Sequence, residues 1–310
     1  MRKKVSIFGA GNVGASLAQL LVSSGIADCA LIDVAPGLAE GKALDLAQAR
    51  PLYGADVKIE GGEDSSLIQG SDLVVITAGI TRRPGMSRNQ LLETNARIVS
   101  QCAAAVKKHA PQAFIIVVSN PLDAMTWLAA DITGFKKNKV MGMAGALDSS
   151  RFVSLLADAL KASVKDIQAL VLGGHGDQMV PVLSAATWQG QPVAQILARD
   201  QLSKIIDRTR NAGAEIVSKM NTSAFFSPAA GVFQMLKAIF ADEKRLLCAS
   251  AWLKGEYGIK GLFIGVPIIL GKDGVEKVVE LEMTREEKAE LEKSRAAVSK
   301  LVSELKKLKI

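Results

Sequence analysis

One of the two histidines in the 310-residue chain has surroundings that suit proton transfer. His175 lies in the segment Gly-Gly-His-Gly-Asp at 173–177, directly after a predicted buried strand, and its glycine neighbours leave the imidazole accessible. An imidazole accepts or donates a proton near neutral pH, as the oxidation of an alcohol requires. The motif alone fits a proton acceptor and a histidine that only fixes a loop equally well. His109 ends a predicted helix, where we expect it to bond the terminal carbonyls.

Arginines and an acid form two further candidate groups. The segment 81–88 is a Gly- and Pro-containing loop after a predicted strand, with three arginines, Arg82, Arg83 and Arg88. Guanidinium groups bind carboxylates through paired hydrogen bonds, so this loop predicts capture of an acidic substrate and could close over it. Asp148 and Arg151 share one face of a predicted helix. Either they only pair with each other, or Asp148 orients an imidazole while Arg151 holds a carboxylate.

Near the start of the chain, the glycine spacing predicts a dinucleotide site. Gly9, Gly11 and Gly14 follow a short apolar strand and open a helical pattern. In such a turn the first glycine allows the bend, the second admits a pyrophosphate and the third lets helix and sheet pack closely. A second strand, 29–33, ends in Asp33, whose carboxylate can accept the adenine ribose hydroxyls and repels a 2′-phosphate. We therefore expect NAD rather than NADP, against the alternative that Asp33 only caps the next helix.

Strand and helix patterns alternate through the first half of the chain and predict a parallel sheet. Helices are predicted at 38–49 and about 87–109, and strands near 5–8, 29–33, 57–59, 72–77, 114–118 and 140–143. Strands separated by such helices form right-handed crossovers. We expect an α/β Rossmann fold, a doubly wound parallel sheet, in a domain spanning 1–144 that binds ligands at the carboxyl ends of its strands.

The second half has a different pattern and predicts an α+β substrate-binding domain at 145–310. Helices are expected at 150–160, 198–220 and 231–241, and strands at 167–172, 246–253, 262–270 and 275–281. The clustered strands with glycine-containing connections favour an antiparallel arrangement. Thr284 and Glu287 form a predicted capping box for a last helix, whose apolar stripe we expect to pack on the body of the chain.

Composition excludes several classes of protein. The longest apolar runs are far shorter than a membrane span, and basic residues do not interleave with aromatics, so we expect neither membrane insertion nor nucleic-acid binding. The net charge of +7 would help to collect anionic substrates. Three separated cysteines in apolar surroundings predict reduced, buried thiols, no metal site and a cytoplasmic location.

Together these motifs resemble the lactate and malate dehydrogenase family over essentially the whole chain. The resemblance implies that His175 is the proton acceptor, that Asp148 orients it, and that Arg151 anchors a substrate carboxylate. It further implies that Arg88 polarises the reacting oxygen and that Asn120 contacts both substrate and cofactor. The implied cofactor contacts are Gly9, Ala10, Gly11, Asn12, Val13, Gly14, Asp33, Asn95, Val118, Ser119 and Asn120.

Arg82 occupies the position that selects the substrate within this family. An arginine suits the second carboxylate of oxaloacetate, whereas a neutral residue suits the methyl group of pyruvate, so we expect malate rather than lactate as the substrate. Phe225-Phe226 and Gln178 depart from the family pattern without removing a catalytic group. The family also implies a homo-oligomer, with a tetramer favoured over a dimer. A non-catalytic NAD sensor is the alternative of another class, but it would have no use for a proton acceptor.

Overall fold

The computed structural model describes residues 2–81 and 85–308. Arg82 and Arg83, predicted to lie in the substrate loop, are outside these residues. Six parallel strands form the first part of the structure, in the order β3-β2-β1-β4-β5-β6. Their bounds are Lys4–Phe8 (β1), Asp28–Ile32 (β2), Ile59–Gly62 (β3), Leu73–Ile76 (β4), Phe114–Val117 (β5) and Val140–Gly142 (β6). This order confirms the predicted doubly wound sheet.

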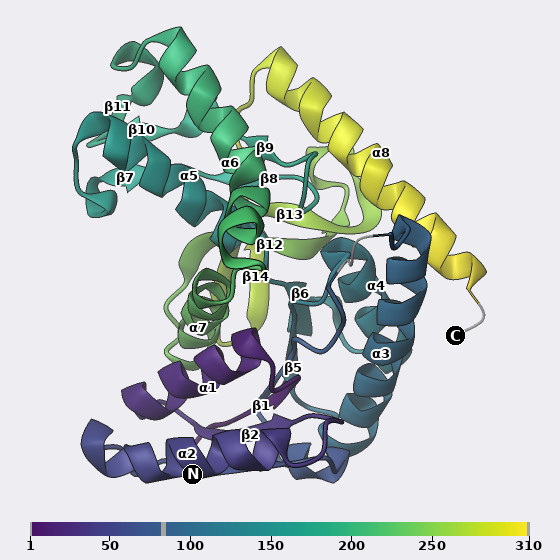
Figure 1. Cartoon of the computed structure of the whole chain (residues 1–310). Coiled ribbons are helices and arrows are strands. Elements are labelled where there is room, and N and C mark those ends of the chain that lie inside the picture. The colour runs from purple at the N-terminus through teal and green to yellow at the C-terminus, as the bar shows by residue number, and fades with distance from the viewer. Residues whose placement is uncertain (1, 82–84, 309–310) are drawn as a thin grey trace.

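Helices cover both faces of this sheet, as a parallel sheet requires, and its apolar central strands are buried except for the half-buried Phe114 at the start of β5. The helices of the first half are Asn12–Ser24 (α1), Leu38–Tyr53 (α2), Arg88–His109 (α3) and Leu122–Thr133 (α4). Helices α3 and α4 lie together on one side, whereas α1 lies on the other side (Figure 1). Ser87 and Gln90 form a capping box that begins α3.

Three antiparallel strands of the second half extend the same sheet. They are Arg245–Lys254 (β12), Lys260–Gly271 (β13) and Gly274–Val278 (β14), and β12 pairs with β6 through Ser250 and Gly142. The strands are antiparallel as predicted, but they belong to one nine-stranded sheet and not to a sheet of their own. The second half of the chain is therefore anchored directly to the edge of the parallel sheet.

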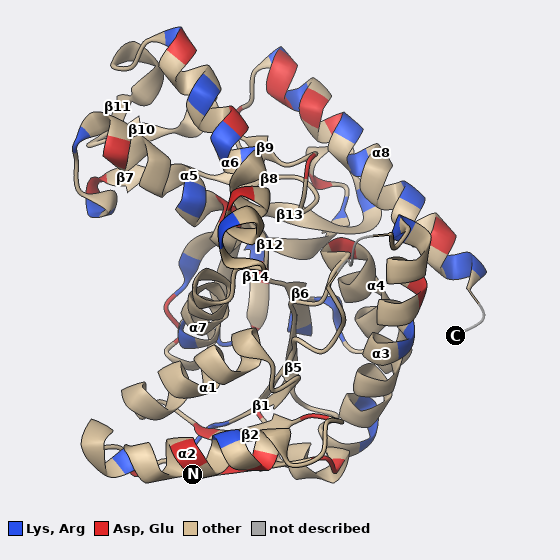
Figure 2. Cartoon of the chain, in the orientation of Figure 1, with Lys and Arg blue, Asp and Glu red and all other residues tan. Residues whose placement is uncertain are grey.

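The helices of the second half are Gly145–Leu160 (α5), Arg199–Met220 (α6), Phe226–Phe240 (α7) and Arg285–Lys307 (α8). Helix α8 begins at the predicted capping box of Thr284 and Glu287 and packs on α3 and α4, with Leu291, Val298 and Val302 buried. Lys and Arg alternate with Asp and Glu along α6 and α8 (Figure 2). Within residues 2–81 and 85–308, no helix is long and apolar enough to cross a membrane.

Several predicted boundaries were wrong. The strand expected at 167–172 is two short strands, Ile167–Gln168 (β7) and Val171–Leu172 (β8). Each pairs with a different neighbouring strand, so the two belong to different small sheets. Helices α5 and α7 each begin five residues before the predicted start; the first turn of α5 is buried, whereas α7 begins with the exposed Phe226. Helix α2 continues through Pro51, which lies in its last turn; the Ala47 carbonyl, which the proline cannot bond, accepts a hydrogen bond from Arg50 Nε at 3.0 Å instead.

The remaining strands are short: Val180–Pro181 (β9), Thr187–Trp188 (β10) and Gln191–Pro192 (β11). Single 3₁₀ turns connect the larger elements at Ser65–Ile68, Lys137–Lys139, Val164–Asp166, Leu183–Ala185, Val193–Gln195 and Glu256–Gly258.

Candidate active site

The glycine turn between β1 and α1 has the geometry of a phosphate site. Gly9 has a φ of +99°, and a Cβ on Gly14 would lie 1.9 Å from the Gly9 carbonyl oxygen, so both positions require glycine. At Gly11, by contrast, a Cβ would meet no described atom within 4 Å. The open space at Gly11 faces the start of α1, which no described side chain caps. Free N–H groups at a helix start favour an anion such as a pyrophosphate.

Asp33 follows β2 directly and binds the glycine turn from the side. Its Oδ2 accepts a hydrogen bond from the Ala10 N–H at 2.7 Å, and its Oδ1 accepts one from the Ala35 N–H at 2.9 Å. The cap of α2 is Gly37, so the alternative that Asp33 only caps this helix is wrong. A carboxylate held beside the glycine turn fits the ribose of a dinucleotide and opposes a 2′-phosphate.

The loops after β4 and β5 are held together by Asn95, which is buried on α3. Its Nδ2 donates to the carbonyl oxygens of Ile80 at 3.0 Å and Asn120 at 2.6 Å, while its Oδ1 accepts from the Ile80 N–H at 2.8 Å. Ser119 is also buried, and its hydroxyl donates to the Ala78 carbonyl oxygen. Asn120 itself is exposed, and Val118 is half-buried. Asn95 therefore shapes the edge of the sheet at which the cofactor contacts are predicted.

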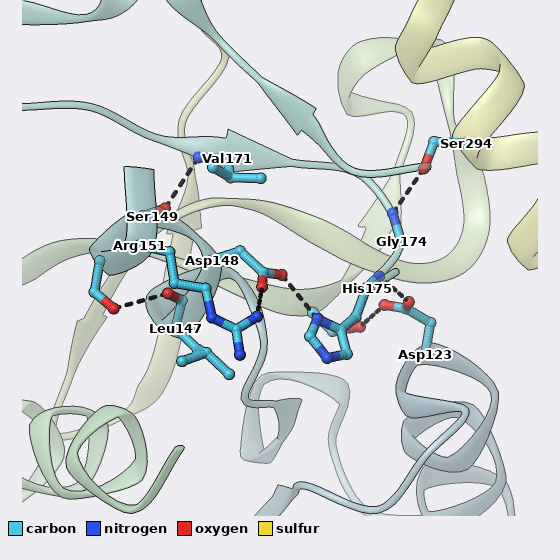
Figure 3. A network of polar contacts seen from close by, with 11 residues as sticks. Asp123, Leu147, Asp148, Ser149, Arg151, Val171, Gly174, His175 and Ser294 are labelled. Atoms are coloured by element: carbon cyan, nitrogen blue, oxygen red, sulfur yellow. Dashed lines mark hydrogen bonds and ion pairs between the residues drawn. The ribbon is translucent and has the colours of Figure 1, made fainter. Parts of the chain in front are cut away.

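His175, Asp148 and Arg151 meet around one buried carboxylate (Figure 3). Asp148 Oδ2 lies 2.8 Å from His175 Nδ1, and Asp148 Oδ1 lies 3.3 Å from Arg151 Nη1. The side chain of Asp148 is 3% exposed, whereas that of His175 is 21% exposed. The imidazole is thus fixed at Nδ1 while the ring reaches solvent. Asp148 pairs with Arg151 and bonds His175 at the same time, so the interpretation that Asp148 and Arg151 only pair with each other is wrong.

The charges of this cluster act on the histidine in opposite directions. Burial lowers the pKa of the His175 imidazole, but the charge of Asp148 and its hydrogen bond outweigh burial, so the pKa is raised above the usual 6.5. Arg151 opposes this rise. Burial also lowers the pKa of the Arg151 guanidinium, although Asp148 opposes that shift. A histidine in this setting can exchange a proton near neutral pH.

Gly173 and Gly174, the two glycines before His175, allow close packing of this loop. The Gly174 N–H donates to the Ser294 hydroxyl oxygen at 2.8 Å, and the His175 N–H donates to Asp123 Oδ2 at 3.1 Å. A Cβ on Gly174 would lie 2.5 Å from a methyl carbon of Val298, and Gly173 has a φ of +88°. The loop is therefore fixed by α4 and α8 on either side.

The guanidinium of Arg151 is only partly used by described residues. No described residue accepts a hydrogen bond from its buried Nε. A buried guanidinium N–H without a partner is costly, and a bound carboxylate would satisfy it.

Arg88, the first residue of α3, is 76% exposed, and its Nη2 lies 3.6 Å from Asp177 Oδ2, two residues beyond His175. The structure thus brings His175, Asp148 and Arg151 together and places Arg88 at their edge.

Analysis of the sequence missed the residues that hold the histidine loop. Asp123 and Ser294 bind its main chain, and Ser250 donates to Asp123 Oδ1 at 2.6 Å. The signal for Asp123 was present, because it is the first acid in an otherwise apolar helix start after Asn120-Pro121. In the described part of the chain, no cluster of three His, Cys, Asp or Glu residues could hold a metal ion.

The doubly wound sheet, its glycine turn and the carboxylate-bound histidine define a dinucleotide-dependent enzyme of the dehydrogenase class. Residues 3–142 match the family model of the lactate/malate dehydrogenase NAD binding domain, and residues 145–309 match that of the family's alpha/beta C-terminal domain. The chain belongs to the lactate/malate dehydrogenase family, and NAD is its cofactor.

Relatives from both branches of this family are similar to the chain over its whole length. A malate dehydrogenase from Geotalea uraniireducens is 47% identical, with 98% of this chain and 99% of that protein covered. The crystal structure of Cryptosporidium parvum malate dehydrogenase has a TM-score of 0.96 at 41% identity, over 99% of this chain and 100% of that one. The lactate dehydrogenase of the same organism, complexed with lactic acid and nicotinamide adenine dinucleotide, has a TM-score of 0.97 at 38% identity, covering 99% of each chain.

Proposed function

We propose that this chain is an NAD-dependent malate dehydrogenase, an oxidoreductase that interconverts (S)-malate and oxaloacetate. The observation that carries the proposal is the Asp148 carboxylate, which holds a solvent-accessible imidazole and a partly unpartnered guanidinium in one cluster. The first group suits the hydroxyl proton of a 2-hydroxy acid, and the second suits its neighbouring carboxylate. The malate dehydrogenases among the relatives support the choice of substrate.

In malate oxidation, neutral His175 accepts the hydroxyl proton at Nε2 while Asp148 holds Nδ1. The Arg151 guanidinium binds the C1 carboxylate and fixes C2 relative to the imidazole. NAD, when bound, supplies the acceptor for the hydride that leaves C2. In the reverse direction, protonated His175 donates the proton to the keto oxygen. Arg88 polarises that oxygen once the substrate replaces Asp177 as its partner.

The other contacts in this proposal are those predicted from the sequence. Arg82 binds the second carboxylate, and Asn120 contacts both substrate and cofactor. The cofactor lies along the glycine turn and the carboxyl ends of the strands, against Gly9, Ala10, Gly11, Asn12, Val13, Gly14, Asp33, Asn95, Val118, Ser119 and Asn120. The open space at Gly11 and the carboxylate of Asp33 fit this placement. We place the boundary of the two domains, 1–144 and 145–310, before α5.

A spectrophotometric assay tests the proposal. We expect NADH to be consumed with oxaloacetate, and pyruvate to give a kcat/KM lower by roughly four orders of magnitude, because a site built around a charged partner rejects the analogue that lacks it. Comparable rates with oxaloacetate and pyruvate would contradict the proposal that malate is the substrate. A faster reaction with pyruvate would favour lactate dehydrogenase, the activity named for one of the similar structures.

We also propose that the chain forms a homotetramer. Large apolar side chains are exposed on α2 and at the start of α7: Leu44 is 61% exposed, Leu52 is 88% exposed and Phe226 is 69% exposed. Such exposure favours a covered interface. Light scattering at micromolar concentration would give the mass of four chains, and a monomer would contradict the proposal.

A cytoplasmic role in the tricarboxylic acid cycle is the remaining part of the proposal. Cys29, Cys102 and Cys248 are buried free thiols, and burial raises the pKa of each to about 12. Buried cysteines that form no disulfide are typical of proteins in a reducing compartment.

A further inference from the structure

Asp123 is a buried acid next to the proposed proton acceptor, with no part in the chemistry described so far. It is the second residue of α4, and only 5% of it is exposed. Its Oδ1 accepts a hydrogen bond from the Ser250 hydroxyl at 2.6 Å, and its Oδ2 accepts one from the His175 N–H at 3.1 Å. Burying a carboxylate is costly unless its hydrogen bonds are satisfied, so these two contacts define its place.

These contacts join three parts of the fold. Helix α4 begins directly after Ser119–Pro121, at the proposed cofactor edge, whereas Ser250 lies on β12 and His175 lies in the loop between β8 and β9. Figure 3 shows Asp123 on the far side of His175 from Asp148. Asp148 holds the imidazole ring, while Asp123 holds the main chain of the same residue. With only one of these acids, either the ring or the backbone could shift.

We propose that Asp123 is a positioning residue that fixes His175 for proton transfer, through its main-chain hydrogen bond and through its charge. This inference rests on the proposed role of His175 as proton acceptor. Asp123 does not touch the substrate; it acts through the histidine. Because a displacement of about 1 Å at a reacting group can lower a rate by about a hundredfold, a fixed backbone matters as much as a fixed ring.

The charge of Asp123 has a defined direction of effect. Burial raises the pKa of Asp123 to about 6, although its bonds with Ser250 and His175 oppose the rise. The charged or titratable groups that act on Asp123 are His175 and Asp148, whereas β12 and α8 contribute the neutral hydroxyls of Ser250 and Ser294 to this region. In its ionised form, Asp123 stabilises the imidazolium and so adds to the rise in the pKa of His175, against the opposing charge of Arg151.

Two substitutions separate the hydrogen bond from the charge. Asp123→Asn keeps the size, an oxygen that can accept the His175 N–H and an amide that can donate to Ser250, so it removes mainly the charge. Asp123→Ala removes both. Asp131→Asn is the matched control, because Asp131 is an exposed acid on the same helix.

The histidine resonances of the whole protein provide a readout independent of activity. Because the chain has only two histidines, an NMR titration resolves His175 and His109, and the His175→Asn variant assigns them. We expect His175 to titrate at lower pH in Asp123→Asn than in the wild type, with His109 unmoved and Asp131→Asn unchanged. In the pH–rate profile of malate oxidation, the loss of activity toward acid should also move to lower pH in Asp123→Asn, since the neutral imidazole then persists to lower pH.

For Asp123→Ala we expect kcat to fall by roughly tenfold to a hundredfold, while the Kd for NADH, from protein fluorescence, stays within about twofold. An unchanged His175 titration in Asp123→Asn, or wild-type kcat in Asp123→Ala, would overturn the inference. If the alanine variant does not fold, the asparagine titration decides alone. Near-normal turnover in His175→Asn would instead overturn the proposed function, so the two failures are distinguishable.

Discussion

Nδ1 of His175 lies 2.8 Å from Oδ2 of Asp148, although the two residues are 27 positions apart and belong to different elements. The other oxygen of Asp148 lies 3.3 Å from Arg151, so one buried carboxylate fixes the proposed proton acceptor relative to the guanidinium proposed to bind the substrate carboxylate. This relationship determines what the site can do. It holds the ring in the orientation that leaves Nε2 available, and it ties the strength of the base to a nearby charge.

Replacing Asp148 with asparagine should weaken the base. Burial lowers the pKa of His175, and Asp148 is the main group that raises it again, so its loss lowers the pKa of the imidazole. The acid limb of the malate-oxidation profile should then move to lower pH, because the neutral imidazole persists there. Turnover should fall by about a hundredfold or more, since the imidazolium loses the charge that stabilises it and the amide can hold the tautomer whose Nε2 already carries a proton. A pH–rate profile of kcat checks this, and an unmoved acid limb would contradict it.

The glycine turn offers a pair of substitutions with opposite outcomes. Gly14→Ala would put a methyl group 1.9 Å from the Gly9 carbonyl oxygen, so we expect a loss of roughly 2–3 kcal/mol in the free energy of unfolding. Gly11→Ala meets no described atom, so the protein should keep its stability. Its NADH affinity should still fall at least about tenfold, because the methyl occupies the space for the pyrophosphate. Urea unfolding and fluorescence titration of both variants test this; equal losses of stability would contradict it.

Cofactor choice should depend on Asp33, which is held beside the glycine turn at 2.7 Å from the Ala10 nitrogen. The wild type should prefer NADH strongly, and Asp33→Ser should narrow that preference by roughly tenfold to a hundredfold in kcat/KM, since the repulsion of a 2′-phosphate is lost. Asp28→Ser is the control, because it removes an acid from the other end of the same strand. Wild-type enzyme that uses both cofactors equally well would rule out this role.

The sequence predicts those parts of the fold that depend on local patterns. Apolar strands, the glycine turn and the capping box of Thr284 with Glu287 all lie where their residues place them. The extension of the first sheet by β12, β13 and β14 could not be predicted, because it depends on one long-range pairing of Ser250 with Gly142. The bond between Asp123 and His175 was missed for the same reason, since it joins two residues 52 positions apart.

Substrate choice provides a prediction outside the described residues. Arg82→Gln should collapse the preference for oxaloacetate over pyruvate, mainly through lost oxaloacetate activity, because a second carboxylate loses its charged partner. Arg83→Gln, one residue further along, is the matched control and should leave the preference nearly intact. The measurement is kcat/KM for both keto acids in both variants. If Arg83→Gln and not Arg82→Gln removes the preference for oxaloacetate, the second carboxylate binds to Arg83.

The most direct test of the account is the turnover of His175→Asn with saturating NADH and oxaloacetate. Asparagine keeps the loop contacts of the main chain but cannot donate or accept the proton. We predict that turnover falls by about three orders of magnitude, because general acid–base catalysis by the imidazole is lost, while the Kd for NADH stays at its wild-type value. Near-normal turnover in this variant would contradict the assignment of His175 as the group that transfers the proton.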